Sequence, residues 1–295
     1  REIQTRMVAK SFNRWNILVA ISLLVVGRGN DIILLTENEP SAELANQSSG
    51  IQSIITNVDN SQYSIQLGFG TNSSGKVNWI PVILDTVSPW TWAGVSGCQC
   101  SGLGTSEHPF SMNSNSWSQS SQVVSADISG ATINGNSGII DLYLTDSVKA
   151  SSATIAAIKS ASGFKTTTCN GMLGLTPQGP SGNQKSFMQQ LVSSGVISKN
   201  IFTLMLVPDG SSEDSYIEFG AVNYDYVKTN NYFIYASLDP QAPYGQHYSF
   251  NLSELSLGKT SFKYQMTRID IGKTAKSEDV LLPYIYEKPR SSSTF

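Results

Sequence analysis

Residues 80–88 read Ile-Pro-Val-Ile-Leu-Asp-Thr-Val-Ser, an apolar run that ends on a carboxylate followed by two hydroxyl residues. A short apolar run of this kind is typical of a buried strand, so we expect Asp85 to lie at the end of a strand inside the protein. A buried carboxylate is costly unless its neighbours donate hydrogen bonds to it, and Thr86 and Ser88 carry suitable donors. The alternative is a surface turn, because Asp-x-x-Ser is common in turns.

A weaker copy of this pattern, Asp-Ile-Gly-Lys-Thr, follows at residues 270–274. Two carboxylates that are brought together do not both ionise readily, so they tend to share one proton. Such a pair can take a proton from water and give one to a leaving group. The alternative interpretation of Asp270 is an exposed turn carboxylate between Arg268 and Lys273.

Residues 85–92, Asp-Thr-Val-Ser-Pro-Trp-Thr-Trp, resemble the first active-site loop of the pepsin-like aspartic proteases, which is Asp-Thr-Gly-Ser with a tryptophan a few residues later. Residues 270–274, which run toward Leu-Leu-Pro, resemble the second loop of that family. Further segments resemble the family in the same order along the chain, namely the entry strand at 63–71, Asn-Gly-Met-Leu-Gly-Leu at 170–175, the strand at 201–204 and Ile-Glu-Phe-Gly-Ala-Val-Asn at 217–223. The resemblance covers most of residues 57–287, and the order of the segments is its strongest part.

The resemblance implies an all-β fold with a few short helices, in which two lobes enclose a cleft. It implies an aspartic endopeptidase whose two acidic residues, Asp85 and Asp270, activate a water molecule against an extended peptide or protein substrate. It also implies a monomer without a cofactor or a metal ion. The residues that would support the acidic pair are Thr86, Ser88, Gly272 and Thr274.

Several residues depart from the family pattern. Val87 replaces a glycine, and a β-branched residue tolerates a positive φ badly. Ile271 replaces a threonine, and Lys273 replaces a hydroxyl residue and would lower the pKa of a neighbouring acid. The predicted flap lies at residues 132–138, where Asn134-Gly135 is a strong hairpin signal.

In that flap, Thr132 or Ile133 stands where the family has a tyrosine. Together, these departures support a second hypothesis, a catalytically inactive family member that binds peptides or proteins. A third hypothesis is an unrelated secreted β-sandwich binding module, in which the two acidic residues would lie far apart.

Composition narrows the class of protein. Charged residues make up 14% of the 295 residues, against roughly 25% in ordinary soluble proteins, and polar turn residues take their place. The net charge of -3 gives no electrostatic case for binding nucleic acid or an anionic membrane. The 2 His and 3 Cys do not form the repeated pairs of a structural zinc site.

The cysteines leave their pairing open. Cys98 and Cys100 lie where the family often has a small disulfide loop, but a single intervening residue makes their direct pairing strained. Cys169 leaves an odd number, so it either pairs with a segment further along or stays a free thiol.

The N-terminal region predicts a targeting signal. Lys10 and Arg14 precede an apolar run over residues 15–26, which is short for a membrane span and suits the apolar part of a signal peptide. A buried helix or strand is the alternative. We therefore expect residues 1–29 to be a signal peptide region and the protein to enter the secretory pathway. We expect it to act outside the cell or in a lysosome- or vacuole-like compartment. After removal of the signal, we expect no stable membrane span to be left.

Three N-glycosylation sequons, at Asn46, Asn72 and Asn251, fit passage through that pathway and predict a glycoprotein. The rest of the chain divides into a leader or linker at 30–56, an N-terminal lobe at 57–207 and a partial C-terminal lobe at 208–295. We expect residues 208–295 to be an incomplete second lobe in a fragment of a longer protein. Within the first lobe, apolar residues spaced by four predict a helix over residues 186–194, with Asn183 and Gly195 as its caps.

Overall fold

The computed structural model describes side chains for residues 50–222, apart from gaps at 58–61, 106–108, 113–116, 129, 166, 182 and 208–211, and for Tyr248. Outside that range it describes the main chain of seven strands. They are β1 (Arg6–Ala9), β2 (Leu23–Val26), β3 (Asp31–Glu37), β14 (Asn231–Ser237), β15 (Tyr248–Leu257), β16 (Thr260–Ile271) and β17 (Tyr284–Tyr286).

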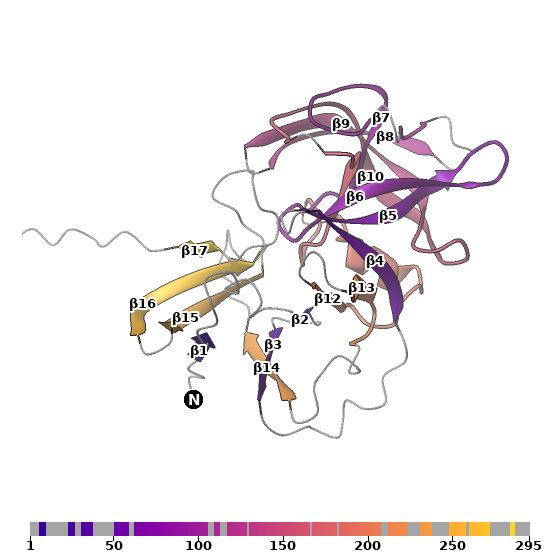
Figure 1. The fold of residues 1–295 in the computed structure, drawn as a ribbon. Helices are drawn as coiled ribbons and strands as arrows, with labels where there is room; N and C mark the ends of the chain where they lie inside the picture. Colours follow the sequence, from indigo (N-terminus) through magenta and orange to yellow (C-terminus); the bar gives the residue numbers. More distant parts are fainter. Residues whose placement is uncertain are drawn as a thin grey trace, which may run out of the picture.

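The fully described part of the chain is almost entirely β (Figure 1). Its strands are β4 (Ile51–Val58), β5 (Gln62–Thr71), β6 (Val77–Asp85), β7 (Trp92–Cys100), β8 (Ser118–Ile128), β9 (Ala131–Tyr143), β10 (Lys149–Ser162), β11 (Gly171–Gly174), β12 (Phe202–Met205) and β13 (Ser215–Phe219). One short helix, α1 (Phe187–Ser193), is found among the described residues. The predicted all-β class is therefore confirmed.

The described strands form two sheets. A 13-stranded sheet has the order β14-β3-β2-β12-β13-β4-β5-β6-β11-β7-β10-β9-β8, and a 4-stranded sheet has the order β1-β15-β16-β17. An additional pairing of β5 with β9 closes β5, β6, β11, β7, β10 and β9 into a barrel. The strand that ends on Asp85 is a wall of this barrel.

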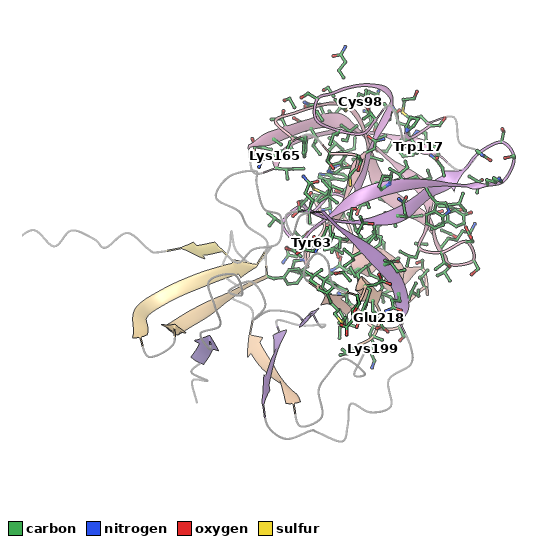
Figure 2. The ribbon with its side chains drawn as sticks, in the orientation of Figure 1. Tyr63, Cys98, Trp117, Lys165, Lys199 and Glu218 are labelled. Carbon is green, nitrogen blue, oxygen red and sulfur yellow. A yellow bond between two sulfur atoms is a disulfide. The ribbon has the colours of Figure 1, made fainter. Side chains whose placement is uncertain are left out.

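Side chains from the described strands pack together into the core (Figure 2). In β9, buried residues alternate with half-buried or exposed ones from Ala131 to Ser137 and again from Gly138 to Tyr143, which is the period of a strand. Each large apolar side chain that is fully buried contributes roughly 1.5–3 kcal/mol to folding. The largest of these side chains are Trp92, Phe69, Phe110, Phe202, Phe219, Leu67, Ile80, Leu84, Ile133 and Ile140.

The hairpin predicted at Asn134-Gly135 is wrong, because both residues lie inside the continuous strand β9. Gly135 is opposite Ile158 of β10, and a Cβ at Gly135 would collide with the carbonyl oxygen of Ala157. This glycine therefore allows two strands to approach closely. The chain turns instead beside Gly130, whose φ is 87° and whose N–H is accepted by Asp127 Oδ1 at 3.0 Å.

Helix α1 lies where the sequence predicts it, but one cap differs. Ser186 is the N-cap, since its hydroxyl accepts the N–H of Gln189 while the Gln189 side chain accepts the N–H of Ser186. This reciprocal capping box satisfies two otherwise free donors, so the predicted role of Asn183 is wrong. Gly195 follows the C-cap with a φ of 73°, as a glycine at a helix end should.

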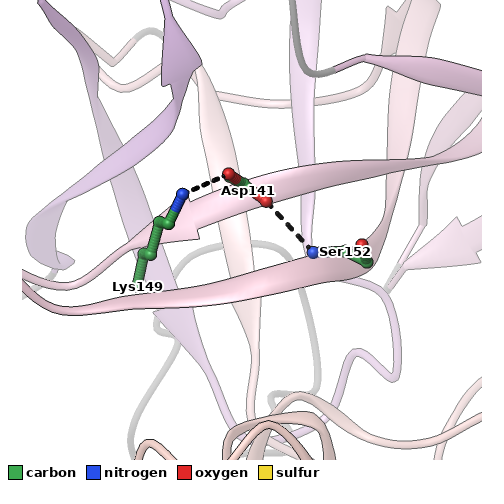
Figure 3. A network of polar contacts seen from close by, with 3 residues as sticks. All are labelled: Asp141, Lys149 and Ser152. Atoms are coloured by element: carbon green, nitrogen blue, oxygen red, sulfur yellow. Dashed lines mark hydrogen bonds and ion pairs between the residues drawn. The ribbon is translucent and has the colours of Figure 1, made fainter.

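A strained bulge in β10 lies opposite β9 (Figure 3). Ser152 has a φ of 55°, and it is the non-glycine residue with a positive φ in the described part of the chain. Asp141 holds this bulge, because its carboxylate accepts the N–H of Ser152 at 3.2 Å and pairs with Lys149 Nζ at 2.6 Å. The hydrogen bond uses the main chain of Ser152, so it does not depend on the serine side chain.

We expect Ser152→Gly to raise the free energy of unfolding by about 0.5–1 kcal/mol, because glycine adopts a positive φ without strain. Asp141→Ala should lower the same free energy by about 1 kcal/mol through loss of the hydrogen bond to Ser152. Urea denaturation of the two variants measures both effects. A destabilising Ser152→Gly would show that the serine side chain contributes more than the strain costs.

The N-terminal strands lie within the predicted signal and leader regions. β2 pairs with β3 and β12, and β1 pairs with β15. The assignments of residues 1–29 and 30–56 remain predictions, as does the lobe boundary at 207–208, on either side of which β12 and β13 are adjacent in one sheet. No helix among the described residues has the length and apolar character needed to span a bilayer.

Candidate active site

Asp85 is the last residue of β6, and it is buried. Six successive residues from Ile80 to Asp85 are buried in this strand, which lies between β5 and β11. The Asp85 side chain belongs to a residue that is only 3% exposed. The alternative of a surface turn is therefore excluded for Asp85.

Backbone donors hold the Asp85 carboxylate. The N–H of Val87 donates to Asp85 Oδ1 at 2.8 Å, and the N–H of Ser88 also donates to the carboxyl group. Burial raises the pKa of Asp85 to about 6, while these two hydrogen bonds act in the opposite direction. Desolvation thus outweighs the donors, and Asp85 is a carboxylic acid that keeps its proton in mildly acidic solution.

The side chains that follow Asp85 shape the loop. Ser88 Oγ accepts the N–H of Trp90 and donates to its carbonyl oxygen, each at 3.3 Å. Ser88 thus reaches Asp85 through its main chain while its hydroxyl braces the turn toward Trp90. Thr86 is fully buried beside them. Val87 does not adopt a positive φ, so this loop does not need the glycine of the family pattern.

The segment after β11 forms the floor under this loop. Gly174 is opposite Asp85 in the parallel pairing of β11 with β6, and the N–H of Leu175 donates to the Asp85 carbonyl at 2.8 Å. Thr176 Oγ1 donates to the carbonyl oxygens of Ser88, at 3.5 Å, and of Gln178, at 2.7 Å. The Gly-Leu-Thr segment therefore supports the main chain on both sides of the acidic residue.

Gly174 has a second role in this floor. A Cβ at this position would lie 2.5 Å from the carbonyl oxygen of Ser88 and 2.6 Å from that of Trp90. Both contacts are with main-chain atoms that cannot rotate away. The glycine is thus required by the close approach of the Asp85 loop.

Asp270 is the penultimate residue of β16, so it also comes at the end of a strand. It is opposite Ser249 of β15 and Tyr284 of β17 in the 4-stranded sheet. Its side chain, and Gly272 and Thr274 altogether, lie outside the described residues. The structure thus describes the surroundings of Asp85 and the strand position of Asp270, and the pairing of their carboxylates remains a prediction.

Tyr248 is a site residue that the sequence analysis did not identify. Its hydroxyl donates to the carbonyl oxygen of Leu175 at 2.7 Å, directly next to the floor under Asp85. A sequence signal existed, because His-Tyr-Ser-Phe-Asn-Leu at 247–252 repeats the pattern Gln-Tyr-Ser-Ile-Gln-Leu at 62–67. The repeat places Tyr248 in the strand pair of Asp270 as Tyr63 is placed in the strand pair of Asp85.

All three cysteines lie among the described residues. Cys98 and Cys100 form a disulfide with a Cα–Cα distance of 5.2 Å, so the direct pairing that sequence analysis regarded as strained is the one present. Cys169 is a buried free thiol. No group of three or more His, Cys, Asp or Glu suited to a metal ion occurs in this part of the chain.

Comparison with known proteins agrees with the arrangement of these segments. The model of the eukaryotic aspartyl protease family matches residues 62–277, a range that begins with β5 and includes both Asp85 and Asp270. No curated protein matches the chain. The match extends over well more than half of the sequence and contains the loop, its floor and the second acidic motif, and the chain therefore belongs to the eukaryotic aspartyl protease family.

Proposed function

We propose that this protein is an aspartic-type endopeptidase in which Asp85 and Asp270 activate a water molecule for peptide hydrolysis. The observation that carries the proposal is the environment of Asp85, a carboxyl group 3% exposed at a strand end and supported by two backbone N–H donors. A perturbed acid in such a setting is typical of a functional site. Membership of a protease family supports the same chemistry.

The two acidic residues take different roles in this proposal. Asp85, with its pKa raised to about 6, is the protonated partner in acidic solution. Asp270 is the ionised partner, and the cationic residues near it in sequence, Arg268 and Lys273, favour its charged form. This division satisfies the need for one acid and one base at the same pH.

Hydrolysis then proceeds in two steps, each with a pair of proton transfers. The Asp270 carboxylate accepts a proton as the water oxygen bonds to the peptide carbonyl carbon, and Asp85 donates its proton to the carbonyl oxygen. As the C–N bond breaks, Asp270 gives its proton to the amide nitrogen and Asp85 takes one back from a hydroxyl of the gem-diol, which yields a carboxylic acid and an amine and restores both acidic groups. The substrate is an extended peptide or protein segment, and the chain acts as a monomer in the secretory pathway or in a compartment reached through it.

The pH profile of cleavage tests the proposal. Asp85 loses its proton as the pH rises through about 6, so we expect cleavage of an unfolded protein substrate to be strong near pH 4 and to fall through that range. Asp270→Asn should lower cleavage at pH 4 by about 10²–10⁴-fold. Cleavage that rises through pH 6, or an Asp270→Asn variant as active as the native chain, would contradict the assigned roles.

A catalytically inactive homologue that binds peptides or proteins is the second candidate. It is favoured by Ile271 and Lys273, which replace a threonine and a hydroxyl residue of the family in the second motif. A tight complex with a statine-type transition-state mimic would argue against this candidate, because such ligands require a working acidic pair. Peptide binding without cleavage and without binding of the mimic would favour it.

A further inference from the structure

Tyr248 joins the two sheets at the floor of the candidate site. It is the first residue of β15, in the 4-stranded sheet, but its side chain is 2% exposed and belongs to the core that β5, β6 and β12 share. Its ring packs edge-on against Phe202 of β12, with the ring centroids 6.0 Å apart. Packing therefore holds the ring in place independently of the hydrogen bond from its hydroxyl.

The hydroxyl of Tyr248 is linked to the main chain of Asp85 through one intervening residue, Leu175. It donates to the carbonyl oxygen of Leu175 at 2.7 Å, and the N–H of Leu175 donates to the carbonyl oxygen of Asp85 at 2.8 Å. Burial raises the pKa of the Tyr248 phenol, so the hydroxyl stays a donor at any physiological pH. Leu175 is thus held by hydrogen bonds at both its N–H and its carbonyl oxygen.

The other end of this connection is the second acidic motif. In the antiparallel pairing of β15 with β16, Tyr248 is opposite Ile271 and Ser249 is opposite Asp270. Asp270 is therefore one register step from Tyr248 in this strand pair. In β5 and β6, where Ser64 is opposite Ile83, Tyr63 is likewise one register step from Asp85.

We infer that Tyr248 is a positioning residue, whose hydroxyl holds the β15–β16 strand pair, and with it Asp270, against the loop that carries Asp85. The inference rests on the proposed function for the role of Asp270. The contacts on which it depends are the two hydrogen bonds through Leu175 and the register of β15 with β16. Without the hydroxyl, the ring can still pack on Phe202, but among the described residues no other hydrogen bond joins β15 to Leu175.

Titration of Asp85 tests the inference without relying on catalysis. Asp residues labelled with ¹³C at the carboxyl carbon are followed by NMR across pH in the native chain, Asp270→Asn, Tyr248→Phe and the double variant, with Asp85→Asn used to assign the Asp85 signal. In the native chain, Asp270→Asn should lower the titration midpoint of Asp85 by about one pH unit or more, because a neighbouring anion is removed. In the Tyr248→Phe background, the same change should move the midpoint by less than about half as much.

The outcomes separate the two proposals. A full effect of Asp270→Asn in the Tyr248→Phe background would overturn the positioning role and leave the acidic pair standing. If Asp270→Asn has no effect in the native chain, the acidic pair is overturned, and the positioning role with it. Tyr143→Phe, on the distant strand β9, is the matched control and should leave the coupling unchanged.

Kinetics give the second measurement. Tyr248→Phe should lower kcat roughly 10- to 100-fold with little change in KM, because the change misplaces the acidic groups and removes no group assigned to peptide binding. Tryptophan fluorescence in urea checks that the variant is folded. If Tyr248→Phe is as active as the native chain and only Tyr248→Ala loses activity, the residue serves packing alone and the inference is wrong.

Discussion

Asp85→Asn should remove peptide cleavage and, at the same time, stabilise the folded chain at neutral pH. Asparagine keeps the shape and the acceptor oxygen that receives the N–H of Val87. It cannot donate or accept the catalytic proton, so kcat/KM at pH 4 should fall by about 10³-fold or more. Replacement of a residue that contributes only to stability would not lower kcat/KM and at the same time raise the free energy of unfolding.

The gain in stability follows from linkage. The pKa of Asp85 is raised to about 6 in the folded chain, against about 4 in the unfolded chain. The folded state therefore binds more protons between these values, and the free energy of unfolding falls as the pH rises from about 4 to about 6. By pH 7.5 the native chain should have lost roughly 3 kcal/mol that it has at pH 3.5, a loss that Asp85→Asn escapes.

Urea denaturation of the native chain and of Asp85→Asn, at pH 4 and at pH 7.5, measures this difference. The two proteins should have similar stability at the lower pH, and the variant should be the more stable at the higher one. Asp146→Asn, which changes an exposed carboxyl group between β9 and β10, is the matched control. A variant that is destabilised at pH 7.5 would mean that the Asp85 carboxylate is better stabilised than its burial suggests.

Gly174→Ala should disturb the fold directly at the Asp85 loop. The added Cβ would press on the carbonyl oxygens of Ser88 and Trp90, at 2.5 and 2.6 Å, and neither is on a flexible side chain. Overpacking of this kind costs about 1–3 kcal/mol or more, and relief requires the Asp85 loop to shift. Activity should therefore fall further than the loss of stability explains.

The matched control for this variant is Gly75→Ala in the turn between β5 and β6. Its Cβ would meet nothing within 4 Å, but its φ is 79°, so it bears backbone strain alone. We expect about 1 kcal/mol of destabilisation for Gly75→Ala, with cleavage unchanged. Equal activity losses in the two variants would show that the floor under the Asp85 loop does not position the acid.

Local patterns predicted much of the chain because they involve neighbours in sequence. The run before Asp85 is a buried strand, and the four-residue spacing before Gly195 is a helix, as periodicity indicated. The N-cap was misassigned because Asn183 and Ser186 are both good caps, and only the reciprocal bonds of Ser186 with Gln189 distinguish them.

Other expectations from the sequence failed where a residue is constrained by contacts with residues far away in sequence. Asn134-Gly135 carries a turn signal, but Gly135 is needed for the approach of Ala157 across the sheet, and this requirement prevailed. Val87 departs from a glycine of the family, yet the main chain of the loop avoids a positive φ and accepts it. Neither outcome follows from the neighbours of these residues in sequence.

The amino-acid sequence alone was enough to predict the family, the all-β class and the acidic residue at the end of β6. Each of these can be recognised from composition, from the alternation of apolar and polar residues or from a contiguous motif. Three features came only with the folded chain, namely the depth at which Asp85 is buried, the glycine-lined floor under its loop and the hydrogen bond from Tyr248 to Leu175. Burial and close approach depend on which strands become neighbours, and strand order arises from contacts between residues far apart in sequence. No local pattern contains that information.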